Sequence, residues 1–478
     1  MFYGRKEQID RFLALWRKPV PSLVVCRGRR RIGKSTLIRE FARQSGGRFL
    51  AFEGLAPDDY MTNAKQLEAF RNQLSAQTGR RIPKLGNWAD AFRQLDAALD
   101  GDGRKTVLLD EVSWMGGYDR TFPAQLKVAW DTLFHARGNL VVFVCGSVST
   151  WIHRNILKSR GFVGRISLDT VVPELPLSEC VKFWGARRTR IDLREILDVL
   201  SVTGGIPRYL EEIDPALPAD ENIRRLCFLP DGYLFREFTE LFNDIVSRTA
   251  PAKRRILEAL AEGPLSGSEL AEKLAVDRNG HLCDILGELE IAGFIAKANG
   301  INPATGRRGR VDQYRLRDNY TRFFLRYVAS RMPEIESGVF SFAGVSQLPG
   351  WEAMMGLQFE NLVVNNYQTL ASALALQGRL VVSAAPFRCS RGARGGGVQV
   401  DLLIQTEGTA YIVEVKRRAE LGVEVAREIA EKVHRLPVKP GMSVRTALVY
   451  DGRLTRGLEM DESVDFFIPI GKLLNPGN

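Results

Sequence analysis

The sequence has few cysteines and no long apolar run, and both features limit the class of protein. Its six cysteines stand singly, with no Cys-x-x-Cys pair, which argues against a zinc site or a disulfide framework. No apolar stretch approaches the roughly 20 residues that a helix needs to span a bilayer. The first residues lack the apolar core of a signal peptide. We therefore expect a cytoplasmic protein that does not enter a membrane.

The length and charge of the chain point to several domains and an anionic partner. A chain of 478 residues is too long for one hydrophobic core, so two to four domains are expected. The net charge of +11 is uneven: residues 1–50 hold 13 Lys/Arg against 3 Asp/Glu, and residues 296–317 hold 6 against 1. Basic charge focused in this way suits a polyanion such as DNA, although part of the first excess serves nucleotide phosphates.

Residues 28–36 (GRRRIGKST) have the spacing of a phosphate-binding P-loop. Glycines let the backbone curl so that its N–H groups point at phosphate oxygens, and the following helix adds the positive end of its dipole. Lys34 is expected to contact the β- and γ-phosphates and Ser35 to coordinate Mg²⁺. An apolar strand over 22–26 and a helix from 36 give the loop its usual context, so the chain is expected to bind ATP or GTP. The residues expected to bind nucleotide are Gly28, Arg31, Ile32, Gly33, Lys34, Ser35, Thr36 and Ser147.

Two further strands are expected to complete this nucleotide site. The strand over 106–110 ends in Asp110, a candidate ligand of Mg²⁺, and is followed by Glu111, a candidate general base for the attacking water. A glutamate in this role separates ATPases from switch GTPases that use a glutamine, which favours ATP. The strand over 139–145 leads to Ser147 and Ser149, either of which is a candidate contact of the γ-phosphate or the water.

The middle of the chain predicts a helical lid and a winged helix-turn-helix. Residues 176–250 read as lid helices, broken by Gly-Gly and Pro at 204–207. Helices over 252–261, 269–274 (capped by Ser268) and 278–291 then precede strands over 293–296 and 311–316. The loop between these strands carries arginines expected to contact DNA phosphates, although winged helices also serve as protein docking modules. These residues are Arg307, Arg308 and Arg310.

A second catalytic constellation follows the Arg/Gly-rich stretch at 388–397. Two apolar strands, 398–404 and 410–416, are joined by a turn and form a predicted hairpin. Glu414 and Lys416 are two residues apart and share one face, with Asp401 beside them on the other strand. Two carboxylates suit Mg²⁺ against a scissile phosphate, and the lysine suits water activation and charge neutralisation. Glu360, on a predicted helix, is a further candidate ligand. The alternatives are a surface salt-bridge cluster on an exposed hairpin and a vestigial or purely binding version of the site.

The whole chain resembles an archaeal-type ATPase of the signal-transducing (STAND) P-loop class, which is AAA+-like and belongs to the additional-strand, catalytic-glutamate division. The resemblance includes a C-terminal PD-(D/E)xK nuclease-like domain, although Val400 stands where the first nuclease motif has proline. It implies that Arg165 senses or stabilises the γ-phosphate, from its own subunit or from a neighbour. The matching segments are Phe2 with Gly4-Arg5, residues 28–35, 109–111, 146–147, 164–165, 204–207, 314–318 and 323–324, and Asp401 with 414–416.

These observations predict an α/β protein of four parts. The parts are a P-loop ATPase core with a parallel sheet (1–175), a helical lid (176–250), a winged helix-turn-helix (251–330) and an α/β restriction-endonuclease-like domain (331–478). The expected function is an ATP-hydrolysing, DNA-associated protein whose nucleotide state controls Mg²⁺-dependent DNA cleavage, and the chain is a possible homo-oligomer. The alternative is a non-nucleolytic ATP-dependent switch or scaffold that binds DNA or a protein partner.

Overall fold

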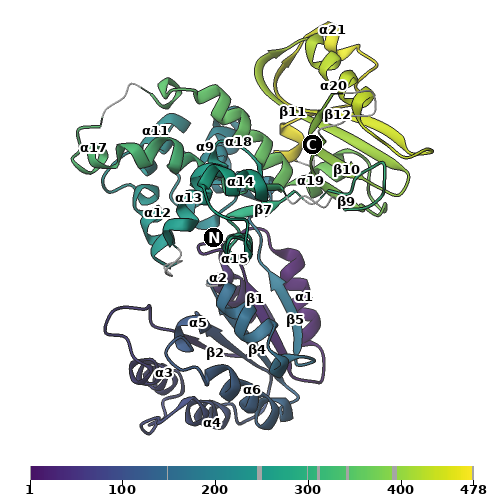
Figure 1. The fold of residues 1–478 in the computed structure, drawn as a ribbon. Coiled ribbons are helices and arrows are strands. Elements are labelled where there is room, and N and C mark those ends of the chain that lie inside the picture. Colours follow the sequence, from purple (N-terminus) through teal and green to yellow (C-terminus); the bar gives the residue numbers. More distant parts are fainter. Residues whose placement is uncertain are drawn as a thin grey trace. The chain divides into compact units, whose positions relative to one another are not determined.

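The chain forms two compact units, Met1–Glu174 and Leu175–Asn478 (Figure 1). The computed structural model describes residues 2–147, 149–244, 250–298, 300–308, 313–340, 344–389 and 396–475. Each unit contains its own five-stranded sheet, and the second also contains a small three-stranded one.

The sheet of the first unit is parallel throughout, with the strand order β2-β3-β4-β1-β5. Its central strands are buried apolar runs, as expected where helices cover both faces. β4 lies between β1, which enters the glycine-rich loop, and β3, which ends in the acidic pair. The sheet confirms the predicted parallel α/β core. The strands are β1 (Ser22–Arg27), β2 (Arg48–Glu53), β3 (Lys105–Asp110), β4 (Leu140–Gly146) and β5 (Ile166–Val171).

Helices cover both faces of this sheet (Figure 1). On one face α1 and α2 pack through Phe12, Phe41 and Phe143, whose ring centroids lie 4.9 to 5.7 Å apart. On the other face α3, α4 and α6 pack around Trp88 and Phe122, whose centroids are 4.9 Å apart. The helices are α1 (Lys6–Trp16), α2 (Lys34–Ser45), α3 (Asn63–Thr78), α4 (Trp88–Ala98), α5 (Val112–Met115), α6 (Phe122–Thr132) and α7 (Ser149–Ile152), with short 3-10 or π turns at Phe134–Ala136, His153–Leu157 and Arg160–Phe162.

The larger sheet of the second unit is mixed, with the order β13-β12-β11-β10-β9. β9, β10 and β11 pair antiparallel, as the predicted hairpin requires, whereas β11, β12 and β13 pair parallel. Parallel pairing requires a crossover, and α20 (Val423–Arg435) supplies it between β11 and β12. The strands are β9 (Ser383–Cys389), β10 (Val398–Gln405), β11 (Thr409–Leu421), β12 (Ser443–Leu454) and β13 (Phe466–Pro469).

One hydrophobic core joins this sheet to helices that lie far earlier in the chain. Leu197 and Leu200 of α9 belong to the same core cluster as Phe359 of α18, Val413 of β11 and Val449 of β12. The region predicted as a lid therefore packs in part against the C-terminal sheet. The helices are α8 (Leu177–Cys180), α9 (Leu193–Thr203), α10 (Pro207–Leu210), α11 (Ala219–Cys227), α12 (Tyr233–Asp244), α16 (Asn319–Phe323), α17 (Met332–Glu336), α18 (Trp351–Asn365), α19 (Tyr367–Ala373), α21 (Arg456–Glu459) and α22 (Gly471–Leu474), with short turns at Val181–Thr189, Phe324–Val328, Ala329–Arg331 and Val345–Gln347.

Three helices and the small sheet β6-β8-β7 form a separate core within the second unit. Ser266, not Ser268, caps α14: it forms a capping box with Glu269, so the helix begins two residues earlier than predicted. Asn279 caps α15, which therefore begins after the predicted start at 278. The elements are α13 (Ala250–Ala261), β6 (Leu265–Ser266), α14 (Gly267–Leu274), α15 (Gly280–Ile291), β7 (Ile295–Lys297) and β8 (Gln313–Leu316).

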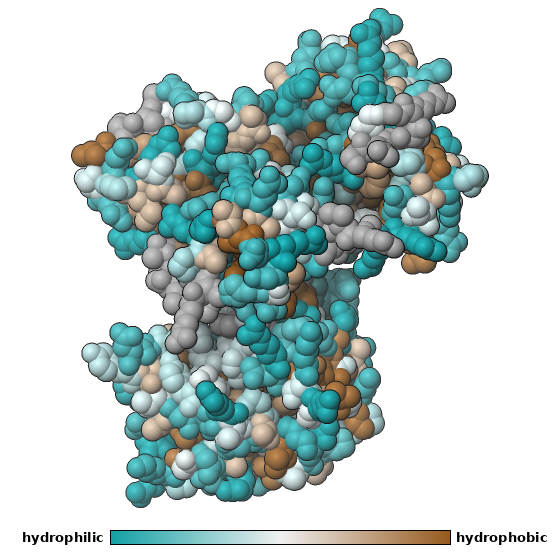
Figure 2. All heavy atoms as spheres, viewed as in Figure 1, coloured by the Kyte–Doolittle hydropathy of each residue, from teal (hydrophilic) through white to brown (hydrophobic). Residues whose placement is uncertain are grey.

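Hydrophilic side chains cover most of the visible face of the molecule, and apolar ones lie in small separate groups (Figure 2). In the part of the chain that the structure describes, no helix combines the length and apolar character needed to cross a bilayer.

Candidate functional site

The glycine-rich loop links β1 to α2 and closes around the side chain of Lys34. The Lys34 Nζ donates to the carbonyl oxygens of Gly28 at 3.1 Å and Arg29 at 3.0 Å. Gly28 has φ 154°, and an added Cβ there would lie 2.7 Å from the Val172 carbonyl oxygen, so only glycine fits. Gly33, at φ 84°, starts α2, whose first turn contains Ser35 and Thr36. The loop has the geometry of a phosphate cradle at a helix N-terminus.

The opening segment of the chain braces this loop. Arg5 is buried, adopts a left-handed backbone conformation (φ 65°) and donates from Nη2 to the Ile32 carbonyl oxygen at 3.2 Å. The bond joins two segments that are 27 residues apart in sequence. Gly4-Arg5 is one of the segments in which the sequence resembles the ATPase family. In the structure, Arg5 fixes one carbonyl oxygen of the predicted nucleotide loop.

Strand register brings the acidic pair to the edge of the sheet that carries the loop. Cys26 of β1 lies opposite Cys145 of β4, and Val144 lies opposite Leu109 of β3. Asp110, which is buried, accepts a hydrogen bond from the Glu111 backbone N at 3.1 Å. Because all three strands are parallel, their carboxyl ends meet where ligands bind in open α/β sheets.

Ser147 contacts Glu111 directly, which sequence reasoning did not foresee. The Glu111 Oε2 accepts from the Ser147 backbone N at 2.9 Å and from its Oγ at 2.8 Å. Glu111 itself has a left-handed backbone (φ 47°). The predicted sensor thus holds the predicted general base in one orientation. Ser149, the other candidate, begins α7.

We expect Ser147→Ala to lower ATP turnover about tenfold while nucleotide affinity stays within about twofold, because Glu111 loses the hydroxyl that orients it. Steady-state turnover and nucleotide titration by fluorescence measure the two effects. An unchanged turnover number would show that the backbone hydrogen bond alone positions Glu111.

Arg165 lies at the opposite edge of the sheet from Lys34. It directly precedes β5, whose Ile166 pairs with Leu23 at the amino end of β1, whereas the glycine-rich loop follows the carboxyl end. Five residues of strand separate these edges by about 16 Å. Arg165 instead forms a bidentate ion pair with Asp131, at 2.6 and 2.9 Å, and this pair holds the pKa of Asp131 well below its usual range. Arg165 does not reach the loop of its own chain, so its role toward a phosphate stays a prediction for a neighbouring copy.

In the second unit, the antiparallel register of β10 and β11 places Asp401 beside Glu414. Leu402 pairs with Val413, so Asp401 and Glu414 are the next residues along. The Asp401 Oδ2 accepts from the Val415 backbone N at 2.9 Å, which fixes the carboxylate across the hairpin. Glu414 is only 1 % exposed, and its Oε1 lies 3.0 Å from the Lys416 Nζ. The three residues predicted from the hairpin therefore converge.

Burial and neighbouring carboxylates raise the pKa of two acids at this point, Asp401 and Glu360. Burial, followed by the charges of Glu414 and Glu360, raises the pKa of Asp401 to about 8. Burial also raises the pKa of Glu360, against the opposing charges of Arg322 and Arg315. Buried like charges favour a nearby cation. Glu360 on α18 thus lies near enough to act on Asp401 electrostatically.

Helix α20 supplies two charged residues that sequence reasoning missed. The Lys432 Nζ lies 2.5 Å from the Glu414 Oε2, and the Glu428 Oε2 lies 2.8 Å from the Lys416 Nζ. Burial alone would lower the pKa of Lys416, but Glu414 and Glu428 raise it above its usual value. The only sequence signal was the i, i+4 spacing of Glu428 and Lys432 on an amphipathic helix, which is also typical of a solvated helix face.

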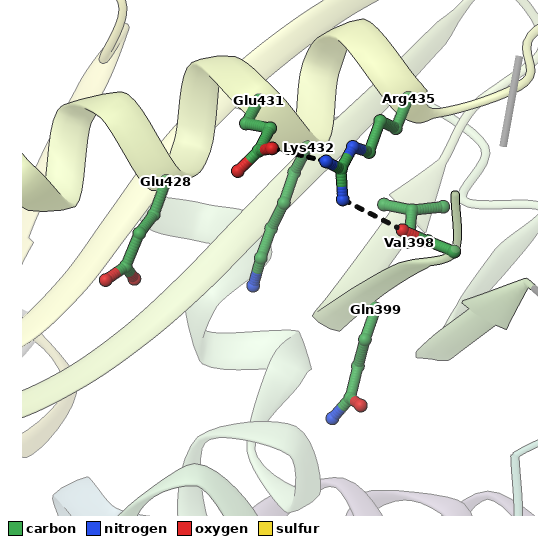
Figure 3. Close-up of a pocket in the computed structure, with 7 residues that line it drawn as sticks. Val398, Gln399, Glu428, Glu431, Lys432 and Arg435 are labelled. Atoms are coloured by element: carbon green, nitrogen blue, oxygen red, sulfur yellow. Dashed lines mark hydrogen bonds and ion pairs between the residues drawn. The ribbon is translucent and has the colours of Figure 1, made fainter. Parts of the chain in front are cut away.

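A pocket of about 280 Å³ opens beside these ion pairs (Figure 3). Gln399 of β10 faces it from one side, and one face of α20 lines the other. Arg435 pairs with Glu431 at 2.5 Å on that face. The pocket gives solvent and ligands access to Lys432. It is lined by Gly397, Val398, Gln399, Glu428, Glu431, Lys432 and Arg435.

The donor set at Asp401 and Glu414 suits Mg²⁺ held mainly by water. Mg²⁺ usually binds through one or two carboxylates and keeps several waters. Across the described ranges, no group of three or more His, Cys, Asp or Glu side chains has the geometry to hold a metal ion. Asp401 and Glu414 thus remain the predicted pair of ligands, and a direct bond from Glu360 stays a prediction. In the first unit, Ser35 and Asp110 stay the predicted ligands of the nucleotide's Mg²⁺.

The loop between β7 and β8 exposes Arg307 and Arg308, whereas Arg310 lies outside the described residues. A turn in which the Asn302 N donates to the Arg307 carbonyl oxygen at 2.8 Å shapes the loop. The loop also contacts the large sheet: Gln405 of β10 donates to the Ile301 carbonyl oxygen at 2.6 Å. The exposed arginines and the strand that carries Asp401 are therefore physically connected.

Comparisons with known proteins give distant similarities. No family model matches the chain. Over 369 residues it is 27% identical to the uncharacterized protein MJECL04 of Methanocaldococcus jannaschii, and the aligned region covers 76% of each chain.

Among solved structures, the chain is similar to the Walker-type ATPase PABY2304 of Pyrococcus abyssi, with a TM-score of 0.48 and 19% identity over 68% of this chain and 96% of that one. It is also similar to the ORC2 protein of Aeropyrum pernix in its ADPNP-ADP complexes, with a TM-score of 0.40 and 14% identity over 69% of this chain and 92% of that one. At these values, the assignment of a P-loop fold rests on the strand order and loop geometry of the chain itself.

Proposed function

We propose that the chain is an ATP-hydrolysing, DNA-associated protein whose nucleotide state controls Mg²⁺-dependent DNA cleavage at its C-terminal site. The observation that carries the proposal is the convergence of Asp401, Glu414 and Lys416 beside an open pocket, in a chain that also contains a P-loop. Isolated surface ion pairs seldom place two carboxylates side by side, because like charges repel each other.

ATP hydrolysis is supported by the arrangement at the carboxyl edge of the first sheet. Lys34 lies inside the loop, ready to contact phosphates, and Ser147 orients Glu111 toward a position from which it can take a proton from water. Ser35 and Asp110 would hold Mg²⁺, which neutralises charge on the β- and γ-phosphates. Arg165 of a neighbouring copy would add positive charge if the protein assembles into oligomers.

DNA association is supported by the small domain of the second unit. Its order of helix, strand, two helices and two strands is that of a winged helix, with α15 as the third helix and the β7–β8 loop as the wing. α15 carries Asp284, Glu288 and Glu290 and is poorly suited to the major groove. The wing arginines therefore supply the phosphate contacts, and the bond from Gln405 to Ile301 joins the wing to the cleavage site.

Cleavage is assigned to the side chains on β10 and β11. When bound, Mg²⁺ would polarise the scissile phosphate and lower the pKa of an attacking water. Asp401 and Glu414 would hold the ion, since a hydrogen bond across the hairpin fixes Asp401 and an ion pair with Lys416 on the same strand fixes Glu414. Lys416, already paired with Glu414, is placed to offset the negative charge that develops on phosphorus oxygens.

The direct test is incubation of the purified full chain with plasmid, linear and branched DNA, with Mg²⁺ or Mn²⁺, with and without ATP. We expect at least one substrate to be nicked or cut, and EDTA to stop the reaction. If no substrate is cut under any nucleotide condition, the cleavage assignment fails. DNA binding that depends on ATP, without cutting, would then favour the alternative of a switch or scaffold.

Replacing Arg307, Arg308 and Arg310 with alanine should weaken DNA binding across sequences. Each lost phosphate contact should reduce the log-log slope of affinity against salt by about one unit. Residues Arg187, Arg188 and Arg190 have the same Arg-Arg-x-Arg spacing on an exposed segment elsewhere, so their triple alanine variant is a charge-matched control. Fluorescence anisotropy at several salt concentrations measures both. Equal slopes in the two variants would assign the effect to net charge rather than to the wing.

A further inference from the structure

Four charged side chains form an alternating chain at the C-terminal site, and both oxygens of Glu414 are engaged in it. The Glu414 Oε1 contacts Lys416 at 3.0 Å and its Oε2 contacts Lys432 at 2.5 Å. Lys416 continues to Glu428 at 2.8 Å. A divalent cation that bonds to Glu414 must therefore displace a lysine from at least one oxygen.

The two lysines differ in how readily they can leave. Lys416 is tied to a second acid, Glu428 of α20, which holds it in place. For Lys432, Glu414 is the one acid in ion-pair contact among the described residues, and its stem extends along the wall of the pocket (Figure 3). A lysine side chain is long and flexible and carries a compact charge. Lys432 is therefore the lysine that moves.

The position of Lys432 also matches the place of a cation. It opposes the pKa rise of both Asp401 and Glu360 and pairs directly with Glu414, so one ammonium serves all three carboxylates. A divalent ion between Asp401 and Glu414 would neutralise the same carboxylates. The ammonium and the ion are thus alternatives, because like charges cannot share so small a space.

We infer that Lys432 is a displaceable counter-ion of this site, which couples divalent-cation binding to the binding of a DNA phosphate. With neither ligand bound, Lys432 neutralises Glu414. When the cation binds, the ammonium turns into the pocket, where a phosphodiester gives it a new partner. Each ligand then favours the binding of the other. DNA tightens metal binding, and in the absence of DNA Lys432 competes with the metal ion for Glu414. This inference rests on the proposed phosphodiester site and adds how that site is regulated.

The test is calorimetric titration of Mn²⁺ into the nucleotide-free full chain, in which heat that Glu414→Gln abolishes is assigned to this site. Lys432→Met should bind Mn²⁺ at least tenfold more tightly than wild type. A short DNA duplex should tighten Mn²⁺ binding to wild type by a larger factor than to Lys432→Met, because the contact between phosphate and ion remains in both proteins and only wild type also gains the Lys432 contact. Lys432→Arg retains the positive charge of the side chain, so its Mn²⁺ affinity, with and without DNA, should match that of wild type. Inorganic phosphate in place of the duplex should give a weaker form of the same effect.

Arg435→Met is the matched control, because it removes one positive charge from the same helix face and the same pocket but from a side chain paired with Glu431. Its Mn²⁺ affinity should stay within about twofold of wild type. Equal affinities of wild type and Lys432→Met, or equal gains in Lys432→Met and Arg435→Met, would overturn the inference. So would the absence of any Mn²⁺ heat that depends on Glu414. If Lys432→Met binds Mn²⁺ more tightly but the protein cuts no DNA, only the cleavage proposal fails.

Discussion

The Lys34→Ala protein is expected to lose nucleotide binding, whereas Glu111→Gln should bind ATP as wild type does and lose at least a hundredfold in turnover. The two residues are predicted to act on different groups. Lys34 lies inside the loop, where it is expected to contact phosphates, so its loss should remove binding energy. Glu111 is expected to act on the attacking water, and glutamine keeps its shape but cannot accept a proton. Nucleotide titration and steady-state phosphate release separate the effects.

Glu68→Gln provides the matched control for Glu111→Gln. Glu68 is an exposed residue of α3 that pairs with Arg71 on the surface of the same unit. We expect this variant to hydrolyse ATP at the wild-type rate. Hydrolysis at the wild-type rate by Glu111→Gln itself would remove Glu111 from the mechanism and leave water activation to another group at the sheet edge.

Features encoded in short segments could be predicted from the sequence. The glycine-rich loop lies between an apolar strand and an amphipathic helix, so its context and its chemistry are visible in about twenty consecutive residues. The hairpin of β10 and β11 is equally local, because a short turn fixes which residues face each other. Asp401, Glu414 and Lys416 consequently converge as expected.

Contacts between distant segments could not be predicted in this way. Arg417, next to Lys416, has a side chain that is 1 % exposed and pairs with Asp198 of α9 at 2.5 Å and Glu352 of α18 at 3.0 Å. These partners lie 219 and 65 residues away in sequence. Nothing in a charged residue's own neighbourhood shows whether solvent or a distant acid will neutralise it. The shared core of α9 and the C-terminal sheet escaped prediction for the same reason.

The position of Arg165 shows a different limit. Its place in the chain, just after a glycine and before β5, matches the order of motifs in the family that the sequence resembles. A residue that precedes a parallel strand nevertheless lies at the amino edge, opposite the ligand-binding edge. The order of motifs along the chain therefore matches the family, but Arg165 lies far from the predicted phosphate site of its own chain. Only a neighbouring copy can bring an Arg165 close to that site.

Asp401→Ala and Lys416→Ala are each expected to lower DNA cleavage at least a hundredfold while ATP hydrolysis persists. Asp401 is a predicted cation ligand fixed by a hydrogen bond across the hairpin, and its loss leaves Glu414 as the one other ligand predicted on these two strands. Lys416 supplies a positive charge beside Glu414 on the same strand, so its loss removes one of the charges that offset the negative charge developing on the phosphate. Supercoiled-plasmid nicking and phosphate release, measured on the same preparations, report the two activities.

Glu420→Gln tests whether any change on β11 has this effect. Glu420 lies on the same strand but is exposed and paired with Arg453 of β12, so its neutralisation should leave cleavage within about twofold of wild type. If Asp401→Ala cuts as well as Glu420→Gln, the carboxylate pair is not the cleavage site. Because the two predicted catalytic sites lie in separate compact units, loss of ATP hydrolysis in Asp401→Ala would instead show that the C-terminal site is needed for nucleotide turnover.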